Sequence, residues 1–145
     1  MKIYLSDTLS KKKKEFIPID HKNVRIYACG PTVYNFPHFG NARMAVVTDL
    51  LVRVLKQKYK KVTFISNITD IDDKIIEAAK EQNVTIGELT NKYHLIYNQD
   101  MESLGVSLPT FQPKATDYIA DMIDFIKILV DNKCAYESDG NILFD

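Results

Sequence analysis

The spacing of apolar residues changes its period within the first half of the chain. Residues 24–29 alternate in polarity and are rich in β-branched and aromatic side chains, which is typical of a strand. Gly30 and Pro31 then interrupt this pattern. From Gly40 onward, apolar side chains recur at helical spacing over about 18 residues. We therefore predict a strand and then an amphipathic helix, whose apolar positions are Val47, Leu50, Leu51, Val54 and Leu55.

The remaining segments alternate between apolar-periodic stretches and turn residues. A short strand over 2–5 and a polar loop with lysines at 11–14 come first, because a run of lysines is typical of a solvated turn rather than a phosphate-binding patch. Two prolines within 106–113 favour an extended connection. Residues 135–145 are predicted to form a hairpin turning at Asp139 and Gly140. The other predicted elements are a strand over 62–66 and helices over 70–82, 85–104 and 116–132.

This order of elements predicts an α/β fold. Strand, helix, strand and two more helices form a βαβ unit with parallel strands and a right-handed crossover, as in doubly wound folds. Ligands in such folds bind beyond the carboxyl ends of the strands, where Cys29 and residues 67–69 both lie. One βαβ unit makes a poor independent sheet, and the chain stops at Asp145 inside the predicted hairpin. We therefore expect a truncated sequence.

Composition narrows the class of protein. The chain has 145 residues, of which 46% are hydrophobic and 26% charged, so it is globular and the size of one ordinary domain. Its net charge is zero and its pI is about 6.8, which excludes a global basic field that recruits nucleic acid. Two cysteines are too few for a disulfide framework. No signal-peptide run and no apolar stretch of about 20 residues is present, so we expect a soluble, cytoplasmic protein without membrane contact.

His38 and Gly40 open the first long predicted helix. Gly40 permits close approach of a ligand, and the free N–H groups of a helix start can hold an anion. A histidine there can donate to a phosphate oxygen and stabilise charge in a phosphoryl or adenylyl transition state. The alternative is that His38 is a helix cap or a packed side chain.

Cys29 admits three interpretations from its chemistry. It can be a small buried thiol, a zinc ligand, or a nucleophile with His38 as its base. No CxxC or HxxxH companion lies nearby, so a complete zinc site cannot be drawn. The carboxylates at 70, 72 and 73 favour helix capping over a magnesium site, and Thr69 can offer its hydroxyl to a polar ligand. The residues interpreted as structural or surface positions are His21, His94 and Cys134.

Several motifs in register carry a resemblance to one family. They are Cys-Gly-Pro-Thr-Val-Tyr at 29–34, His-Phe-Gly-Asn-Ala-Arg at 38–43, and Asn-Ile-Thr-Asp-Ile-Asp-Asp-Lys-Ile at 67–75, with shorter matches at 7–10, 15–18 and 113–116. Together they closely resemble the cysteinyl-tRNA synthetases, which are class I synthetases. The resemblance covers essentially the whole chain, and it implies activation of cysteine with ATP as cysteinyl-adenylate, followed by transfer to tRNA.

The resemblance also implies roles for individual residues. Cys29 matches a zinc ligand whose metal also takes the substrate thiolate, while Gly30 and Thr69 match positions that line the amino-acid site. The stretch from Pro31 to Asn41 matches the "HIGH" signature of the ATP site, in which Pro31, His38, Gly40 and Asn41 bind ATP and His38 and Asn41 are catalytic. The last histidine of the signature is Asn41 here, which can donate hydrogen bonds but carries no positive charge. The resemblance thus implies zinc as cofactor, ATP with magnesium as substrate, and cysteine and tRNA as partners of a monomer.

The family's remaining features lie beyond Asp145. They are a cysteine, a histidine and a glutamate that complete the zinc site, the "KMSKS" loop and the tRNA-binding helical region. The resemblance therefore implies an N-terminal fragment, with the first half of the Rossmann-like, parallel-sheet nucleotide-binding domain over 1–115 and the start of an inserted connective domain over 116–145. We expect this chain alone to be inactive. The alternatives are a cysteine ligase of thiol biosynthesis and a non-catalytic remnant or interaction module.

Overall fold

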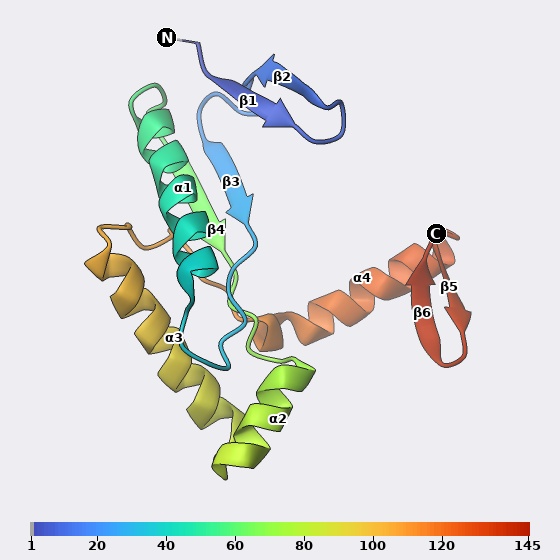
Figure 1. Cartoon of the computed structure of the whole chain (residues 1–145). Coiled ribbons are helices and arrows are strands. Elements are labelled where there is room, and N and C mark those ends of the chain that lie inside the picture. Colours follow the sequence, from blue (N-terminus) through green and yellow to red (C-terminus); the bar gives the residue numbers. More distant parts are fainter. Residues whose placement is uncertain (1) are drawn as a thin grey trace.

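A parallel pair of strands forms the centre of the computed structural model, which describes residues 2–145. Strands β3 (Val24–Ala28) and β4 (Val62–Ser66) pair in parallel, with Val24 opposite Val62 and Ala28 opposite Ser66. Helix α1 (Phe39–Lys56) joins them (Figure 1). The predicted βαβ unit is confirmed. Cys29 and Asn67 directly follow the two strands, so their predicted position at the carboxyl ends is also confirmed, whereas ligand binding at this edge remains a prediction.

The start of the chain differs from its prediction. Strands β1 (Tyr4–Asp7) and β2 (Lys12–Glu15) form an antiparallel hairpin, so the polar loop predicted over the lysines was wrong. One of the lysines is paired across the hairpin, where Lys14 Nζ lies 2.9 Å from Asp7 Oδ2. Ile3 and Phe16, which flank the hairpin, pack against Leu55 and the other members of a small core. Tertiary packing and charge pairing therefore overrode the turn signal.

Helix α1 has the predicted length, but part of its apolar face does not lie in the core. Leu55 and Val52 are buried, whereas Val47 is 59% exposed and Leu50 is 61% exposed. The prediction that Val47 and Leu50 share the buried face was wrong. Asp49, which the periodicity places among the polar positions, is buried and accepts hydrogen bonds from Arg53 and from the main chain of Ser107. The helix thus packs along a narrower stripe than its spacing predicts.

Two further helices pack against the carboxyl ends of the strands. Helix α2 (Asp73–Gln82) begins three residues later than predicted, because Asp72 caps it through the main-chain N–H of Lys74 at 3.0 Å. Helix α3 (Ile86–Ser103) begins with the expected capping box of Thr85 and Glu88. The residues that α2, α3 and the neighbouring loops bury together are Val33, Ile68, Ile75, Ala79, Leu89 and Tyr93.

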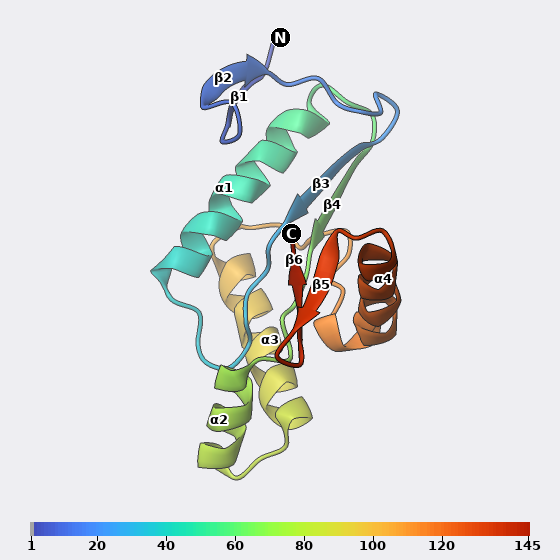
Figure 2. The ribbon, with the colours of Figure 1, turned by 90° about the vertical axis from the view of Figure 1, so that its right-hand side faces the viewer.

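The segment after α3 adds to the sheet edge of β4. Phe111 bridges to Ile65 and Lys114 bridges to Ile68, both in parallel, and Ile68 N–H donates to the Pro113 carbonyl at 2.8 Å. The predicted extended connection is confirmed, and it pairs irregularly with β4 and the residues that follow it. A 3₁₀ turn, η1 (Ala115–Tyr118), follows and leads into α4 (Ile119–Asp131). Figure 2 shows α1 and α4 on opposite sides of the β3–β4 pair, as in doubly wound folds.

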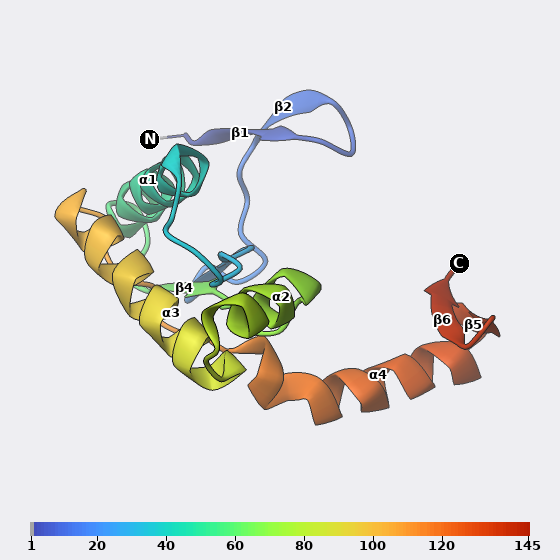
Figure 3. The same cartoon turned by 60° about the horizontal axis from the view of Figure 1, so that its bottom comes forward.

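The end of the chain extends away from the strands. Helix α4 leads to a hairpin of β5 (Ala135–Ser138) and β6 (Asn141–Phe144), as Figure 3 shows. The hairpin turns at Asp139 and Gly140, which both have positive φ angles of 51° and 75°, as the sequence predicts. Over residues 2–145, no helix is both long enough and apolar enough to cross a membrane. The domain division at 115/116 remains a prediction.

Candidate functional site

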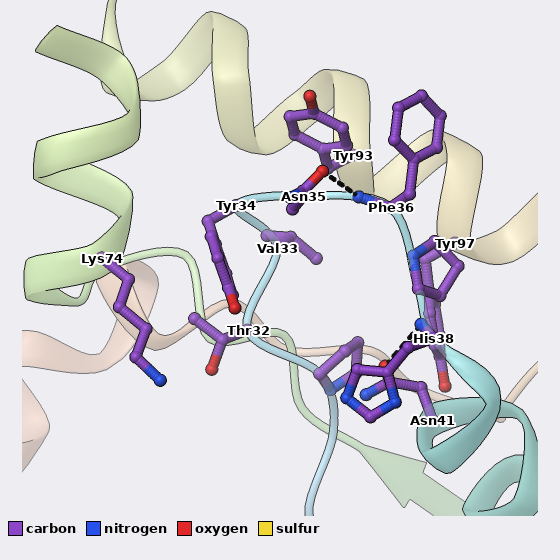
Figure 4. Close-up of a pocket in the computed structure, with 12 residues that line it drawn as sticks. Thr32, Val33, Tyr34, Asn35, Phe36, His38, Asn41, Lys74, Tyr93 and Tyr97 are labelled. Carbon is purple, nitrogen blue, oxygen red and sulfur yellow. Dashed lines mark hydrogen bonds between the residues drawn. The ribbon is translucent and has the colours of Figure 1, made fainter. Parts of the chain in front are cut away.

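A cavity of about 400 Å³ opens where β3 ends. Its walls come from the loop that joins β3 to α1, from the first turns of α1 and α2, and from one face of α3 (Figure 4). It therefore lies beyond the carboxyl ends of the parallel strands, the edge that the sequence identified. The lining residues are Pro31, Thr32, Val33, Tyr34, Asn35, Phe36, Pro37, His38, Asn41, Lys74, Tyr93 and Tyr97.

His38 is the N-cap of α1, and its ring also lines the cavity. Its ring Nδ1 accepts a hydrogen bond from the main-chain N–H of Gly40 at 2.9 Å. The main-chain N–H of His38 donates to Asn41 Oδ1 at 3.0 Å. An acceptor at Nδ1 requires that a neutral ring carries its proton on Nε2. The helix-cap interpretation is thus confirmed, and the cap leaves Nε2–H as a hydrogen-bond donor. In the signature that this sequence resembles, a histidine stands at the position of Asn41. Here the Asn41 side chain accepts from the main chain of His38 and completes the capping box.

Gly40 fits the ring of His38 because it has no side chain. A Cβ at this position would lie 2.7 Å from His38 Cε1 and 2.9 Å from His38 Nδ1. The His38 ring therefore folds back over the helix start only because residue 40 is glycine. Gly40 itself does not line the cavity, so its effect on the site is exerted through His38.

The predicted amino-acid site residues lie together at the strand ends. Gly30 N–H donates to Asn67 Oδ1 at 3.0 Å, and Asn67 Nδ2 donates to Thr69 Oγ1 at 3.2 Å. A Cβ on Gly30 would lie 1.5 Å from the Asn67 carbonyl oxygen, so no other residue fits. Thr69 N–H also donates to the Pro31 carbonyl at 3.0 Å. Asn67 thus connects Gly30 and Thr69 into one unit, with the Thr69 hydroxyl proton still available to a ligand.

Cys29 is exposed at the end of β3, so the interpretation as a buried thiol was wrong. Its Sγ has a weak contact with the Gly30 carbonyl at 3.8 Å. Cys29 is not among the residues that line the His38 cavity, so the structure gives no support to a Cys29–His38 nucleophile pair. Among residues 2–145, no group of three or more His, Cys, Asp or Glu side chains could hold a metal ion. By themselves, the residues present do not fit a zinc centre.

The acidic run has capping and anchoring roles. Asp72 caps α2, which confirms the capping prediction for that residue. Asp70 lies outside the helix and is buried, where it accepts hydrogen bonds from the Thr116 main chain at 3.0 Å and from the Thr116 hydroxyl at 2.6 Å. The two carboxylates thus serve separate contacts, and the magnesium alternative gains no support. Asp70 links the end of β4 to the start of η1.

Several cavity residues could not be identified as a group from the sequence. Tyr34 and Lys74 belong to the motifs quoted above, but Phe36, Tyr93 and Tyr97 carry no motif signal. Tyr93 and Tyr97 are one helical turn apart on α3, so their common face was visible in the sequence. Only the packing of α3 against the β3–α1 loop reveals that this face borders the cavity.

Comparison with known proteins places these features in a family. A family model described as the catalytic domain of class I (C) tRNA synthetases matches residues 15–145. The chain belongs to this family. Among its relatives, a cysteine–tRNA ligase from Maricaulis maris is 50% identical over 143 residues, which is 97% of this chain and 31% of the relative. Another, from Finegoldia magna, is 51% identical over 146 residues, which is 100% of this chain and 31% of the relative.

Membership of the class I synthetases accounts for the fold. The α/β architecture with parallel strands agrees with the predicted class I catalytic domain, and the His38 signature lies at the helix start that follows the first parallel strand. The chain spans about 31% of the length of the curated relatives named above.

Proposed function

We propose that a protein containing this chain is a cysteine–tRNA ligase. Its substrates are cysteine, ATP and tRNA, and it forms cysteinyl-adenylate before transferring the cysteinyl group to the tRNA. The observation that carries the proposal is the His38 cap, which presents Nε2–H to a cavity at the carboxyl edge of a parallel sheet in a class I synthetase family. The relatives named cysteine–tRNA ligase, about 50% identical over nearly the whole chain, support the choice of amino acid.

The chain supplies the phosphate side of the adenylation step. The cysteine carboxylate attacks the α-phosphorus of ATP, and the bond to the leaving pyrophosphate breaks. His38 Nε2–H donates to the phosphate oxygens, where negative charge builds up, and the N-terminal end of α1 adds its positive dipole. Because the cap fixes the ring before substrate binds, the donor needs little reorganisation during the reaction.

The amino-acid side of the site is the unit of Gly30, Asn67 and Thr69. Two hydrogen bonds hold this unit together, and Gly30 directly follows Cys29 in the chain. We propose that Thr69 donates its hydroxyl proton to the bound amino acid. We also propose that Cys29 is one ligand of a zinc ion whose other ligands come from residues outside 2–145. Zinc prefers a thiolate over a hydroxyl, so such an ion would favour cysteine over serine.

Metal content tests the zinc proposal. In a protein of the relatives' full length, we expect about one zinc ion per chain. Because zinc sites use about four ligands, Cys29→Ser should lose most of the metal. Cys134→Ser, which changes an exposed thiol in the turn after α4, is the matched control and should keep the metal. Equal zinc in the wild type and in Cys29→Ser would contradict the proposed ligand.

Cysteine-dependent exchange between ATP and pyrophosphate tests the activity. We expect exchange from the full-length protein and none from residues 1–145 alone, because this chain holds only one side of the proposed ATP site. Robust exchange by the 145-residue chain would overturn the second expectation. Charging of tRNA by the full-length protein then separates a tRNA ligase from an enzyme that transfers cysteine to a small acceptor.

A further inference from the structure

The His38 cavity has an uneven charge distribution. Its twelve lining residues include one lysine, Lys74, and one histidine, His38, but no aspartate or glutamate. The chain as a whole has zero net charge, so this cavity is a local departure from the average. Walls that carry cationic and N–H donor groups without carboxylates favour an anionic ligand.

Lys74 reaches the cavity from a different helix than His38. It is the second residue of α2, and its main-chain N–H is held by the carboxylate of the capping Asp72 at 3.0 Å. Its Nζ lies 5.9 Å from the centre of the Tyr34 ring, a cation–π contact that keeps the ammonium over the cavity wall. None of the ion pairs found within residues 2–145 involves Lys74. The ammonium group is therefore available to a ligand.

The two donors face each other across the opening. Figure 4 shows Lys74 on one side of the cavity and His38 with Asn41 on the other, with Thr32 and Tyr34 between them. Asp72 and Asp73 are close to Lys74 in sequence but do not line the cavity. A phosphate group fits this arrangement, because its several oxygens accept hydrogen bonds from more than one direction.

The aromatic side chains of the same cavity extend the ligand class to nucleotides. Phe36 is 62% exposed, and its ring is held edge-on against Tyr93 with centroids 5.4 Å apart. An exposed, fixed ring beside a phosphate site can stack against a base.

We propose that Lys74 is a second phosphate-binding side chain of this cavity and contacts a nucleotide phosphate on the side opposite His38. The inference rests on the proposed function, which supplies two sources of such a phosphate, namely ATP and the 3′ end of tRNA. His38 holds the phosphate where charge develops, and Lys74 binds a neighbouring phosphate as a point charge.

Binding measurements on a protein of the relatives' full length test this role. Titration calorimetry with pyrophosphate, ATP and a CCA trinucleotide is compared between the wild type and Lys74→Gln. Loss of one charge-assisted hydrogen bond should weaken binding about tenfold. Lys80→Gln is the matched control, because Lys80 is an exposed lysine in the last turn of the same helix and does not line the cavity.

The three ligands distinguish the sources of the phosphate. Weakening of pyrophosphate and ATP alone assigns Lys74 to the triphosphate, whereas weakening of the trinucleotide alone assigns it to the tRNA end. Unchanged binding of every ligand by Lys74→Gln, an equal loss in Lys80→Gln, or no binding by the wild type at millimolar concentration would overturn the proposal.

The inference and the proposed function can fail separately. If the full-length protein catalyses cysteine-dependent exchange and Lys74→Gln binds all three ligands normally, the function stands and the role of Lys74 falls. If Lys74→Gln weakens binding but the full-length protein charges no tRNA, the phosphate site stands and the proposed function falls.

Discussion

At the scale of single residues, the candidate site depends on one capping side chain and on two glycines that leave room for their neighbours. His38 serves both as a helix cap, through Nδ1, and as a donor toward the cavity, through Nε2. Gly40 makes this possible by leaving room for the ring. Gly30 similarly allows the close approach of the Asn67 carbonyl. Small changes at these glycines should therefore move the side chain of His38 and the main chain of Asn67.

Gly40→Ala should displace the His38 ring, because the new Cβ would lie 2.7 Å from Cε1. A shift of about 1 Å can lower a rate about a hundredfold, which is the loss we expect in cysteine-dependent ATP–pyrophosphate exchange by the full-length protein. Gly87→Ala is the matched control, since nothing lies within 4 Å of a Cβ added there, and it should keep the wild-type rate. An unchanged rate in Gly40→Ala would show that the ring position is not limiting.

His94 should make the stability of the fold sensitive to pH. Burial lowers its pKa, and so does the nearby charge of Lys114, while Gln112 and Asp70 act in the opposite direction. The folded chain thus keeps the ring neutral at a pH where the unfolded chain takes up a proton. The free energy of unfolding should fall as pH decreases through the ordinary histidine range.

Urea unfolding at pH 7.5 and 5.5 checks this expectation. His94→Gln removes the titrating ring while keeping a side chain that can hydrogen-bond to Asn98, the partner of His94 Nε2 at 3.1 Å. The variant should therefore lose less stability than the wild type between the two pH values. Equal losses in both proteins would contradict a lowered pKa for the partly buried His94.

At the scale of elements, the helix starts are specified by short-range hydrogen bonds. In α3, the Glu88 carboxylate accepts from the Thr85 N–H at 2.9 Å and from the Thr85 hydroxyl at 2.8 Å. These bonds, the main-chain one first, lower the pKa of Glu88. The start of α2 is likewise specified by Asp72, whose side chain accepts from the main-chain N–H of Lys74. Such caps lie within a few residues of sequence, which is why the α3 start was predictable.

Thr85→Ala should destabilise the chain by about 1 kcal/mol at neutral pH, as is typical for loss of an N-cap hydroxyl. It should also raise the pKa of Glu88 part of the way to its ordinary value, since the main-chain bond remains. Because the folded pKa is lowered, the stabilisation from Glu88 is present above its ordinary pKa and is lost as pH falls through the folded value.

Urea unfolding and an NMR pH titration of the Glu88 side chain provide the measurements. The conservative control is Thr85→Ser, which keeps a capping hydroxyl and should behave like the wild type. A Glu88 pKa that is the same in the wild type and in Thr85→Ala would show that the hydroxyl bond does not form in solution.

At the scale of the whole molecule, burial is concentrated at one end. Helix α3 buries Leu89, Thr90, Tyr93, Tyr97 and Met101, whereas no residue of α4 is buried. The hairpin of β5 and β6 packs on α4 and lies away from the central strands (Figure 1). Stability against local unfolding should therefore differ strongly between the two ends of the chain. The monomeric state remains a prediction.

Amide hydrogen exchange should reveal this difference. We expect the amides of α4 to exchange faster than those of α3 by on the order of tenfold or more, because local opening of α4 exposes little additional apolar surface. Exchange followed by mass spectrometry of peptides from the two helices provides the measurement. Equal protection of α3 and α4 would mean that α4 is covered in solution.

The sequence by itself determined the elements whose signals are local. Four features depend on residues close together in the chain, namely the βαβ order, the Thr85 cap, the turn at Asp139 and Gly140, and the motif around His38. Periodicity, capping and turn chemistry act over a few residues, so they can be recognised without knowing the fold.

The tertiary structure decided everything that depends on which surfaces meet. It paired the lysine-rich segment with β1, left Val47 and Leu50 exposed, buried Asp49, and left Cys29 at the surface outside the His38 cavity. It also brought Lys74 of α2 opposite His38 of α1. Apolar spacing gives the direction in which a side chain points on its own element, but only packing determines whether another element, a ligand or solvent lies there.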